Sequence, residues 1–195
     1  MTWDDRPRCW WPDGLDHSDP LMVAYHDEEW GVPVAGDRDL FERLALESFQ
    51  AGLAWVTILR KREGFRRAFD DFDPHRVARY DDADRARLLG DADIVRNRAK
   101  IDATIGNASA FLDIAGEFGG FAAYLAHRLE RPAPTLPRTA AGWADIPGST
   151  AESDLLSADL KRRGFKFAGS TIVYAFMQSV GIVDDHLPGC FRYRG

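Results

Sequence analysis

Glycine repeatedly interrupts the helical periodicity of this chain, and this feature most limits the folds that the sequence can adopt. Between glycines such as Gly52, Gly64, Gly90 and Gly164, apolar residues recur at the spacing of one helix face. No run of the sequence alternates apolar and polar residues between turn signals, as a half-buried strand does. The sequence therefore predicts an all-α fold of many short helices.

Capping residues, prolines and glycines indicate where these helices begin and end. The expected helices extend from Asp37, as N-cap, to about Phe49; from Trp55 to about Gly64; from Pro74, as a short piece; from Asp82 to Leu89; from Ile94 to Gly116; from Phe121 to Leu129; from a capping box at Ser149-x-x-Glu152 to Arg163; and from Ser170 to Val180. Residues 1–23 are expected to form an irregular arm, and the prolines of residues 131–137 mark a linker. Residues 1–195 are expected to form a single unit, with two helical lobes as the alternative.

Neither the N-terminus nor any apolar run predicts a membrane protein. The longest apolar stretch, residues 171–183, is interrupted by Gln178, Ser179 and Gly181, so it is too polar to span a bilayer. Residues 1–11 lack the pattern of a secretion signal or transit peptide. We therefore expect a cytoplasmic protein, in which a reducing environment disfavours a disulfide between the two cysteines.

Positive charge is concentrated beyond residue 39, although the net charge of the chain is −6. Residues 1–39 hold ten acidic and three basic side chains, so the remainder sums to +1. Lys and Arg cluster at residues 60–67, 96–100 and 161–166. A basic surface that binds phosphate groups is therefore one expectation, and solvated helix ends are the alternative.

Two cysteines and two histidines near the ends of the chain could form one metal site. His186-x-x-x-Cys190 has the spacing of two ligands in one turn, and Cys9 and His26 lie in the N-terminal region. Two thiolates and two imidazoles form the closed tetrahedral set typical of structural zinc, which would attach residues 1–36 to residues 184–195. The alternative is two unrelated pairs, with His26 hydrogen-bonded in the core.

Residues 24–31, AYHDEEWG, place a phenol, an imidazole, three carboxylates and an indole within one short segment. The acidic residues of this segment are expected to be solvated or to cap helices. Aromatic faces beside a single carboxylate suit a flat cationic ring, through cation–π attraction and hydrogen bonds. The candidates for such a box are Tyr25, Trp30, Glu47 and Trp55. The alternative is a set of core aromatic residues with a surface glutamate.

The last two predicted helices are joined by GFKFAG, residues 164–169, directly after a run of three basic residues. A turn bounded by glycines can expose backbone N–H groups, and the N-terminus of the following helix adds its positive dipole end. An anchor for a phosphate backbone is expected here, with ordinary glycine capping of a helix as the alternative.

Five stretches of the sequence resemble the DNA-3-methyladenine glycosylase I family over nearly the whole chain. They are CWW (9–11), DPLMVAYHDEEWGVP (19–33), LFERLALESFQAGLAWVTILRKRE (40–63), DIVRNRAKIDATIGNA (93–108) and LKRRGFKFAGSTIVYAFMQSVGIVDDHLPGC (160–190). The resemblance implies a helix-hairpin-helix glycosylase fold, with zinc-stapled N- and C-terminal segments, that excises 3-methyladenine from DNA. Its expected partners are double-stranded alkylated DNA and the product 3-methyladenine, and a monomer is expected.

The resemblance also implies roles for individual residues. Structural zinc falls on Cys9, His26, His186 and Cys190; the base pocket on Glu47, Tyr25, Trp30 and Trp55; a wedge into the duplex on Gly52 and Leu53; and the hairpin on Gly164, Lys166 and Gly169. Met22 stands where some members of the family have tyrosine. We expect altered base affinity there rather than lost activity, because the methionine sulfur can still contact a purine face.

An enzyme that acts on a base within a duplex must extrude that base, and Leu53 would then fill the vacated stack. Methylation at N3 leaves the purine cationic and its glycosidic bond weak. Glu47 is therefore predicted to read the base edge and to stabilise the leaving group while water attacks the sugar. No lysine is placed as a nucleophile, so a monofunctional enzyme without strand cleavage is expected. The alternative is a zinc-stapled binding module that recognises damage without excision.

Overall fold

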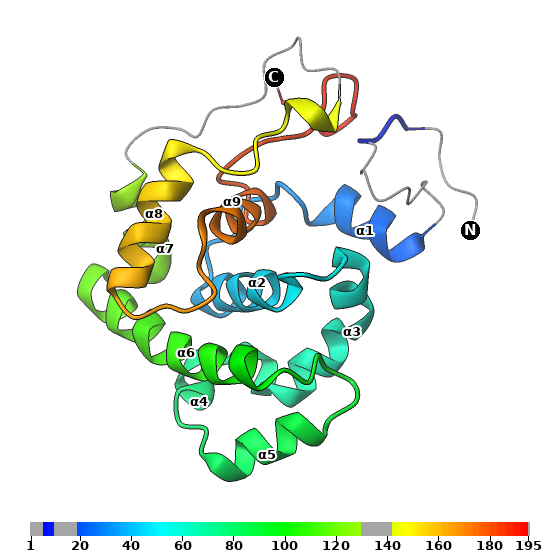
Figure 1. Cartoon of the computed structure of the whole chain (residues 1–195). Helices are drawn as coiled ribbons and strands as arrows, with labels where there is room; N and C mark the ends of the chain where they lie inside the picture. The colour runs from blue at the N-terminus through cyan, green and yellow to red at the C-terminus, as the bar shows by residue number, and fades with distance from the viewer. Residues whose placement is uncertain (1–5, 10–18, 130–141, 195) are drawn as a thin grey trace.

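The structure is a computed structural model that describes residues 6–9, 19–129 and 142–194. All regular elements within these ranges are helices, as the sequence predicts (Figure 1). They are α1 (Pro20–Glu28), α2 (Asp37–Gln50), α3 (Trp55–Ala68), η1 (Asp70–Phe72), α4 (Pro74–Val77), α5 (Asp82–Gly90), α6 (Arg98–Phe118), α7 (Phe121–Arg128), η2 (Trp143–Asp145), α8 (Ala151–Arg162) and α9 (Ser170–Ser179). None of the described helices is both long and apolar enough to cross a membrane.

The helix α2 lies at the centre of the molecule and is contacted by α3, α6, α7 and α9 (Figure 1). Every residue from Leu40 to Phe49 is buried, and these include polar side chains such as Glu42, Arg43 and Glu47. A helix buried on all sides must find partners for its polar groups or keep them for function. The charged residues of α2 are therefore the first place to look for a site.

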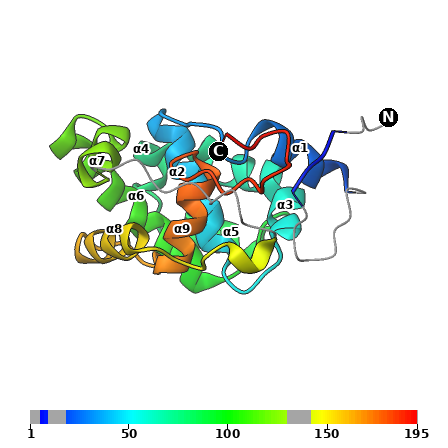
Figure 2. The same ribbon diagram turned by 90° about the horizontal axis from the view of Figure 1, so that it is seen from above.

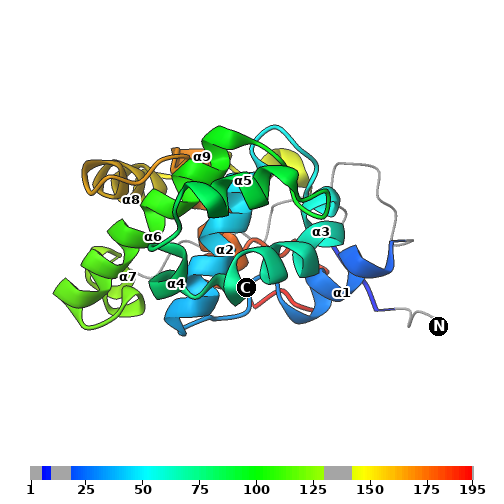
Figure 3. The same ribbon diagram turned by 90° about the horizontal axis from the view of Figure 1, so that it is seen from below.

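Aromatic contacts join α2 to the helices around it. The ring centroids of Phe49 and Phe65 lie 4.6 Å apart between α2 and α3, and those of Phe41 and Phe111 lie 5.3 Å apart between α2 and α6. A second, smaller apolar cluster joins α1 and α3 to the C-terminal segment around Leu187. Views from above (Figure 2) and below (Figure 3) place α1 and α3 at the opposite end of the molecule from α7 and α8.

Two boundaries of the central helices differ from those expected. The N-cap of α2 is Gly36 rather than Asp37. The side chain of Asp37 instead accepts a hydrogen bond from the N–H of Phe121, the first residue of α7, at 2.9 Å. The helix α3 continues past Gly64 to Ala68. A Cβ at Gly64 would lie 2.5 Å from the carbonyl oxygen of Asp93, so this glycine permits close packing and does not end the helix.

The helix α1 was not expected, because residues 1–23 were assigned to an irregular arm. Asp19 caps this helix by accepting the N–H of Leu21 at 2.9 Å, and Pro20 occupies its first position. An Asp followed by Pro is a helix-start signal, and it was the available clue. The expectation is therefore wrong for residues 20–23.

The later boundaries are shifted by a few residues. The capping box of α8 is formed by Thr150 and Ser153, one residue beyond the expected pair. The helix α6 begins at Arg98, where the side chain of Asn97 caps it, rather than near Ile94. The expected linker at 131–137 lies outside the described residues.

Candidate functional site

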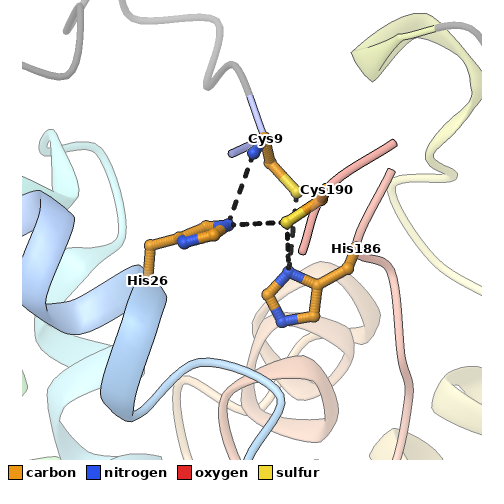
Figure 4. A group of neighbouring side chains, drawn as sticks. All are labelled: Cys9, His26, His186 and Cys190. Atoms are coloured by element: carbon orange, nitrogen blue, oxygen red, sulfur yellow. Dashed lines mark hydrogen bonds between the residues drawn. The ribbon is translucent and has the colours of Figure 1, made fainter. Parts of the chain in front are cut away.

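Four buried side chains from both ends of the chain meet at one point (Figure 4). Cys9 precedes α1, His26 lies on α1, and His186 and Cys190 lie after α9. Their ligand atoms all lie within 4.8 Å of one another. The structure thus brings together the four residues that the sequence singled out.

The spacing of these atoms suits a tetrahedral ion. Cys9 Sγ lies 3.5 Å from His186 Nδ1, and Cys190 Sγ lies 3.4 Å from His26 Nε2 and 3.7 Å from His186 Nδ1. A zinc ion with bonds of about 2.3 Å to sulfur and about 2.0 Å to nitrogen would hold its ligand atoms roughly 3.5 Å apart. The donor set therefore fits zinc in both chemistry and separation.

The surroundings of the cluster orient its imidazoles. His26 Nδ1 lies 2.8 Å from Asp27 Oδ1, and His186 Nε2 lies 3.2 Å from the carbonyl oxygen of Trp30. Both oxygens accept a hydrogen bond from the ring nitrogen that faces away from the sulfurs, so the other nitrogen presents its lone pair to the cluster. Asp27 also accepts hydrogen bonds from Arg8 at 2.6–3.0 Å.

The pKa values of the two thiols move in opposite directions, so only Cys190 favours the thiolate when no metal is bound. Hydrogen bonds with Cys9, His186 and His26 lower the pKa of Cys190, and the N–H of Arg192 points to its sulfur at 3.4 Å. The neighbouring Cys190 sulfur and burial raise the pKa of Cys9, although the N–H of Leu187 lies 3.2 Å from its sulfur. Two adjacent buried thiolates require a cation, which is what a metal supplies.

The predicted base-binding residues lie next to the cluster, on three different helices. The ring centroids of Tyr25 on α1 and Trp55 on α3 are 5.2 Å apart at an angle of 51°. Trp55 Nε1 is buried and has no hydrogen-bond partner in the described part of the chain. The two rings and an unpaired donor therefore lie together, as a site for a flat polar ring requires.

Two other predicted members of the pocket pack closer to the metal cluster. The ring of Trp30 stands edge-on to His186, with centroids 4.6 Å apart. Met22 is buried in the apolar cluster that also contains Tyr25 and Trp30. Of the predicted base-binding side chains, only that of Glu47 lines the cavity described below, and Tyr25, Trp55, Trp30 and Met22 do not. Contact of these four residues with a base therefore stays a prediction.

Glu47 is a buried carboxylate that accepts no hydrogen bond from any described residue. Burial raises its pKa to about 8, and the positive charge of Arg43 opposes that rise. Glu47 is near enough to Tyr25 that its charge raises the pKa of that phenol, after the larger effect of burial. A group with this pKa changes its charge near neutral pH, which is typical of functional sites.

A cavity of about 240 Å³ opens beside Glu47. It lies between the end of α2 and the start of α9, and it is lined by Glu47, Gln50, Ala51, Gly52, Leu53, Thr171, Ile172 and Ala175. Gly52 has a φ of 80° at the turn after α2, and the side chain of Leu53 is 40% exposed. The predicted wedge residues therefore stand at the rim of the space that holds the predicted base-reading carboxylate.

Sequence reasoning missed Lys100, which supports this rim from behind. Its buried ammonium donates to the carbonyl oxygens of Phe49 at 2.8 Å and Ala51 at 2.7 Å, and burial lowers its pKa. The carbonyls at the end of a helix lack partners within the helix. Lys100 supplies the missing hydrogen-bond donors and so fixes the turn that carries Leu53.

The expected basic surface survives only in part. Within residues 60–67, Arg60 pairs with Asp19, Arg62 and Arg66 share Glu42, and Arg67 pairs with Asp93. The acidic segment 24–31 also takes part, because Glu29 binds Arg62 and Asp27 binds His26. The expectation that its carboxylates are solvated or helix-capping is therefore wrong for Asp27 and Glu29. The exposed cations outside any ion pair of the described residues include Arg96, Arg98, Lys161 and Lys166.

The turn between α8 and α9 uses much of its backbone internally. Asn107 on α6 accepts the N–H of Lys166 at 2.8 Å and donates to its carbonyl oxygen at 2.9 Å. The N–H groups of Gly164 and Phe165 bond to carbonyls of α8. Any anion at this turn is thus left with the later N–H groups and with the start of α9, where Gly169 provides no side-chain cap.

Comparison with known proteins gives a consistent result. The family model described as methyladenine glycosylase matches residues 15–193. The chain is 46% identical over 188 residues to DNA-3-methyladenine glycosylase 1 of Escherichia coli, covering 96% of this chain and 97% of that protein.

Solved structures agree in fold. A crystal structure of 3-methyladenine DNA glycosylase I matches with a TM-score of 0.88 and 46% identity, covering 96% of this chain and 100% of that one. A variant of 3-methyladenine DNA glycosylase I solved in complex with 3-methyladenine matches with a TM-score of 0.84 and 36% identity, covering 89% of this chain and 92% of that one. The chain therefore belongs to the methyladenine glycosylase family.

Proposed function

We propose that this protein is a DNA-3-methyladenine glycosylase, which hydrolyses the N-glycosidic bond of 3-methyladenine in alkylated DNA as a step of base-excision repair. Membership of the family supports the reaction. The observation that carries the assignment to a site is Glu47, a buried carboxylate without a hydrogen-bond partner among the described residues, beside Tyr25 and an empty cavity.

Base recognition follows from the charge of the damaged base. A purine methylated at N3 in DNA is a cation, and its glycosidic bond is already weak. Burial destabilises the ionised form of Glu47, and a bound cationic base would stabilise that form again. Tyr25 and Trp55 would offer aromatic faces to the ring of the base. Because the pKa of Glu47 is about 8, binding of the cation favours loss of the Glu47 proton. Water then attacks the sugar as the base leaves.

Extrusion of the base is assigned to the turn after α2. Leu53, which is 40% exposed, would enter the stack that the base vacates. Gly52 at a φ of 80° permits the tight turn, and Lys100 holds that turn against α6. The base would thereby pass from the duplex into the adjacent cavity.

The DNA backbone is assigned to the helix-hairpin-helix formed by α8, the turn 163–169 and α9. The uncapped N-terminus of α9 lies at the Glu47 cavity, since Thr171 and Ile172 line it. A phosphate bound there would place the neighbouring nucleotide at the cavity. Lys166 on this turn and Lys161 in the last turn of α8 are exposed and add positive charge.

We assign structural zinc to Cys9, His26, His186 and Cys190. The donor chemistry and the separations of 3.4–3.7 Å support this assignment. When bound, zinc would neutralise the two thiolates and hold the two ends of the chain together. Four protein ligands leave no open position for water, so the chemistry of excision belongs to Glu47 and its neighbours.

Strand cleavage is not part of the proposed reaction. It would require a lysine amine that can attack the sugar, and none of the lysines lines the Glu47 cavity. The buried amine of Lys100 is committed as a donor to two carbonyl oxygens. We further propose a monomer acting in the cytoplasm, where bacterial DNA lies.

Release of free bases from methylated double-stranded DNA tests this function. We expect free 3-methyladenine among the products, and intact strands until the abasic sites are cleaved by alkali. A protein that binds the methylated duplex but releases no base would establish the alternative, a damage-binding module. Parallel assays of other alkylated bases would show how Met22 affects selectivity.

A further inference from the structure

A chain of ion pairs runs beneath the proposed base pocket. Arg43 Nη2 lies 2.5 Å from Glu29 Oε2, and Arg62 Nη1 lies 2.7 Å from the same oxygen. Arg62 Nε lies 2.7 Å from Glu42 Oε1, to which Arg66 also binds at 2.9 Å. This row of ion pairs therefore alternates in charge from Arg43 to Arg66 and links α1, α2 and α3.

These are the same elements that carry the pocket. Glu29 is the C-cap of α1, which bears Tyr25; Arg43 lies on α2, which bears Glu47; and Arg62 lies on α3. The side chains of Arg43 and Glu42 are only 9% and 7% exposed. Buried ion pairs seldom add net stability over apolar packing of the same volume, so stability alone is a weak reason for a charge at Arg43.

Arg43 is the member of this row of ion pairs that lies nearest to Glu47 along α2. It precedes Glu47 by one helical turn, so the two side chains lie on the same face of α2. Its guanidinium carbon lies 5.7 Å from the centre of the Tyr25 ring. Its Nη1 is buried and has no hydrogen-bond partner in the described part of the chain. Arg43 is therefore only partly neutralised by Glu29.

The other charged groups around Glu47 are few. The cavity wall from α9 consists of uncharged residues, Thr171, Ile172 and Ala175. Lys100 on α6 is turned to the carbonyls at the end of α2. On α1 and α3, Tyr25 is a buried phenol, and Glu29 and Arg62 are bound to each other. Among the described residues, Arg43 is thus the charged group placed to act on Glu47, one helical turn away on the same face of α2.

We propose that Arg43 is a positioning residue for the proposed glycosylase reaction, whose charge, limited by Glu29, keeps enough of Glu47 ionised to receive a cationic base. This inference rests on the proposed function. A free guanidinium here would repel the cationic base, whereas a guanidinium paired with Glu29 acts mainly on Glu47. The direction of the pKa agrees, because burial raises the pKa of Glu47 and Arg43 alone opposes the rise.

The test measures the pH dependence of base release in single-turnover reactions on methylated DNA. Arg43→Met is expected to move the midpoint of the rate profile to higher pH, so that the rate falls roughly tenfold at pH 7 for a midpoint one pH unit higher and recovers in alkali. Arg43→Lys keeps the charge and is expected to retain the wild-type midpoint. Glu29→Gln frees the charge of Arg43 and is expected to move the midpoint to lower pH.

Protonation of Glu47 can also be followed without DNA. Its carboxyl carbon resonance in isotope-labelled protein is assigned by its loss in Glu47→Gln, and its titration midpoint should shift in the same directions. An unchanged midpoint in folded Arg43→Met overturns the inference, and if that variant fails to fold, an unchanged midpoint in Glu29→Gln does so. Shifted midpoints in a protein that releases no base would instead leave the inference standing and overturn the proposed function.

Discussion

At the scale of single residues, burial of Glu47 opposes the negative charge that the proposed reaction requires of it. Glu47 is useful to a cationic base only when ionised, yet its surroundings favour the protonated form and raise its pKa to about 8. A protein designed for stability alone would place an uncharged side chain at this position. Glu47 should therefore cost stability in the DNA-free protein, in proportion to its ionisation.

Glu47→Gln is expected to stabilise the DNA-free protein in alkali. The pKa of Glu47 is higher in the folded than in the unfolded chain, so the free energy of unfolding falls as pH rises from about 4.5 through about 8. The variant should match the wild type near pH 4.5 and exceed it at pH 9 by a few kcal/mol, since each tenfold change in the protonation equilibrium is worth about 1.4 kcal/mol. Urea denaturation at the two pH values measures the difference. An equal difference at both values would contradict the assignment of the raised pKa to Glu47.

At the scale of helices and turns, local patterns in the sequence predicted most elements and few of their exact ends. The periodicity of α2, α6 and α9 was recognised because each buries a stripe or more of apolar residues. Gly64 was misread because only the fold reveals that the backbone at Asp93 leaves no room for a Cβ. The helix α1 was not predicted because polar and apolar residues are mixed along it and no apolar face recurs at helical spacing, although Asp19 and Pro20 signalled its start.

Pairing across distant elements was equally hidden from the sequence. The cationic run at residues 60–67 looked like a phosphate-binding surface, but Asp19, Glu29 and Glu42 lie against it once the chain folds. The Cys and His set was suggested by its chemistry and spacing, and the resemblance to the family implied the same four residues. Lys100 was assigned to the basic cluster at residues 96–100, and this was wrong because its ammonium is buried against two carbonyl oxygens that the sequence does not reveal.

Lys100→Met is expected to loosen the turn that carries Leu53. The variant keeps an unbranched apolar stem but leaves the carbonyls of Phe49 and Ala51 without their donor. We expect base release from duplex DNA to fall roughly 10–100-fold because the wedge is misplaced. Binding of free 3-methyladenine, measured by calorimetry, should change much less. Equal losses in both assays would argue against a role in extrusion.

Lys166→Ala is expected to reduce the salt dependence of DNA binding. Lys166 is exposed on the turn between α8 and α9, and loss of one phosphate contact should lower the slope of log Kd against log salt by about 1. Arg67→Ala is the control, because Arg67 is exposed but paired with Asp93. The same slope change in both variants would contradict the assignment of the hairpin as the phosphate anchor.

At the scale of the whole molecule, the metal cluster and the pocket share one helix. His26 on α1 belongs to the cluster, while Tyr25, the preceding residue, packs on Trp55. Attachment of the two chain ends to α1 thus also holds Tyr25, one of the residues proposed to bind the base, in place. Residues 24–31, dense in mixed chemistry, divide between these two tasks.

Cys9→Ala is expected to abolish stoichiometric zinc and to lower the thermal unfolding temperature by several degrees. Binding of a structural metal contributes directly to folding, so loss of one of four ligands weakens both. His75→Ala, at an exposed histidine on α4 outside the cluster, is the control and should change neither property. Zinc content by mass spectrometry that stays at one per chain in Cys9→Ala would refute the ligand assignment.

The single-turnover rate of 3-methyladenine release from methylated duplex DNA, compared between the wild type and Glu47→Gln, tests the central claim most directly. We predict rapid release by the wild type and a large loss in the variant, with zinc content and helicity unchanged. The neutral amide matches the carboxylate in size but cannot compensate the charge of the base. Release by Glu47→Gln at the wild-type rate across the pH range would contradict the role of this carboxylate.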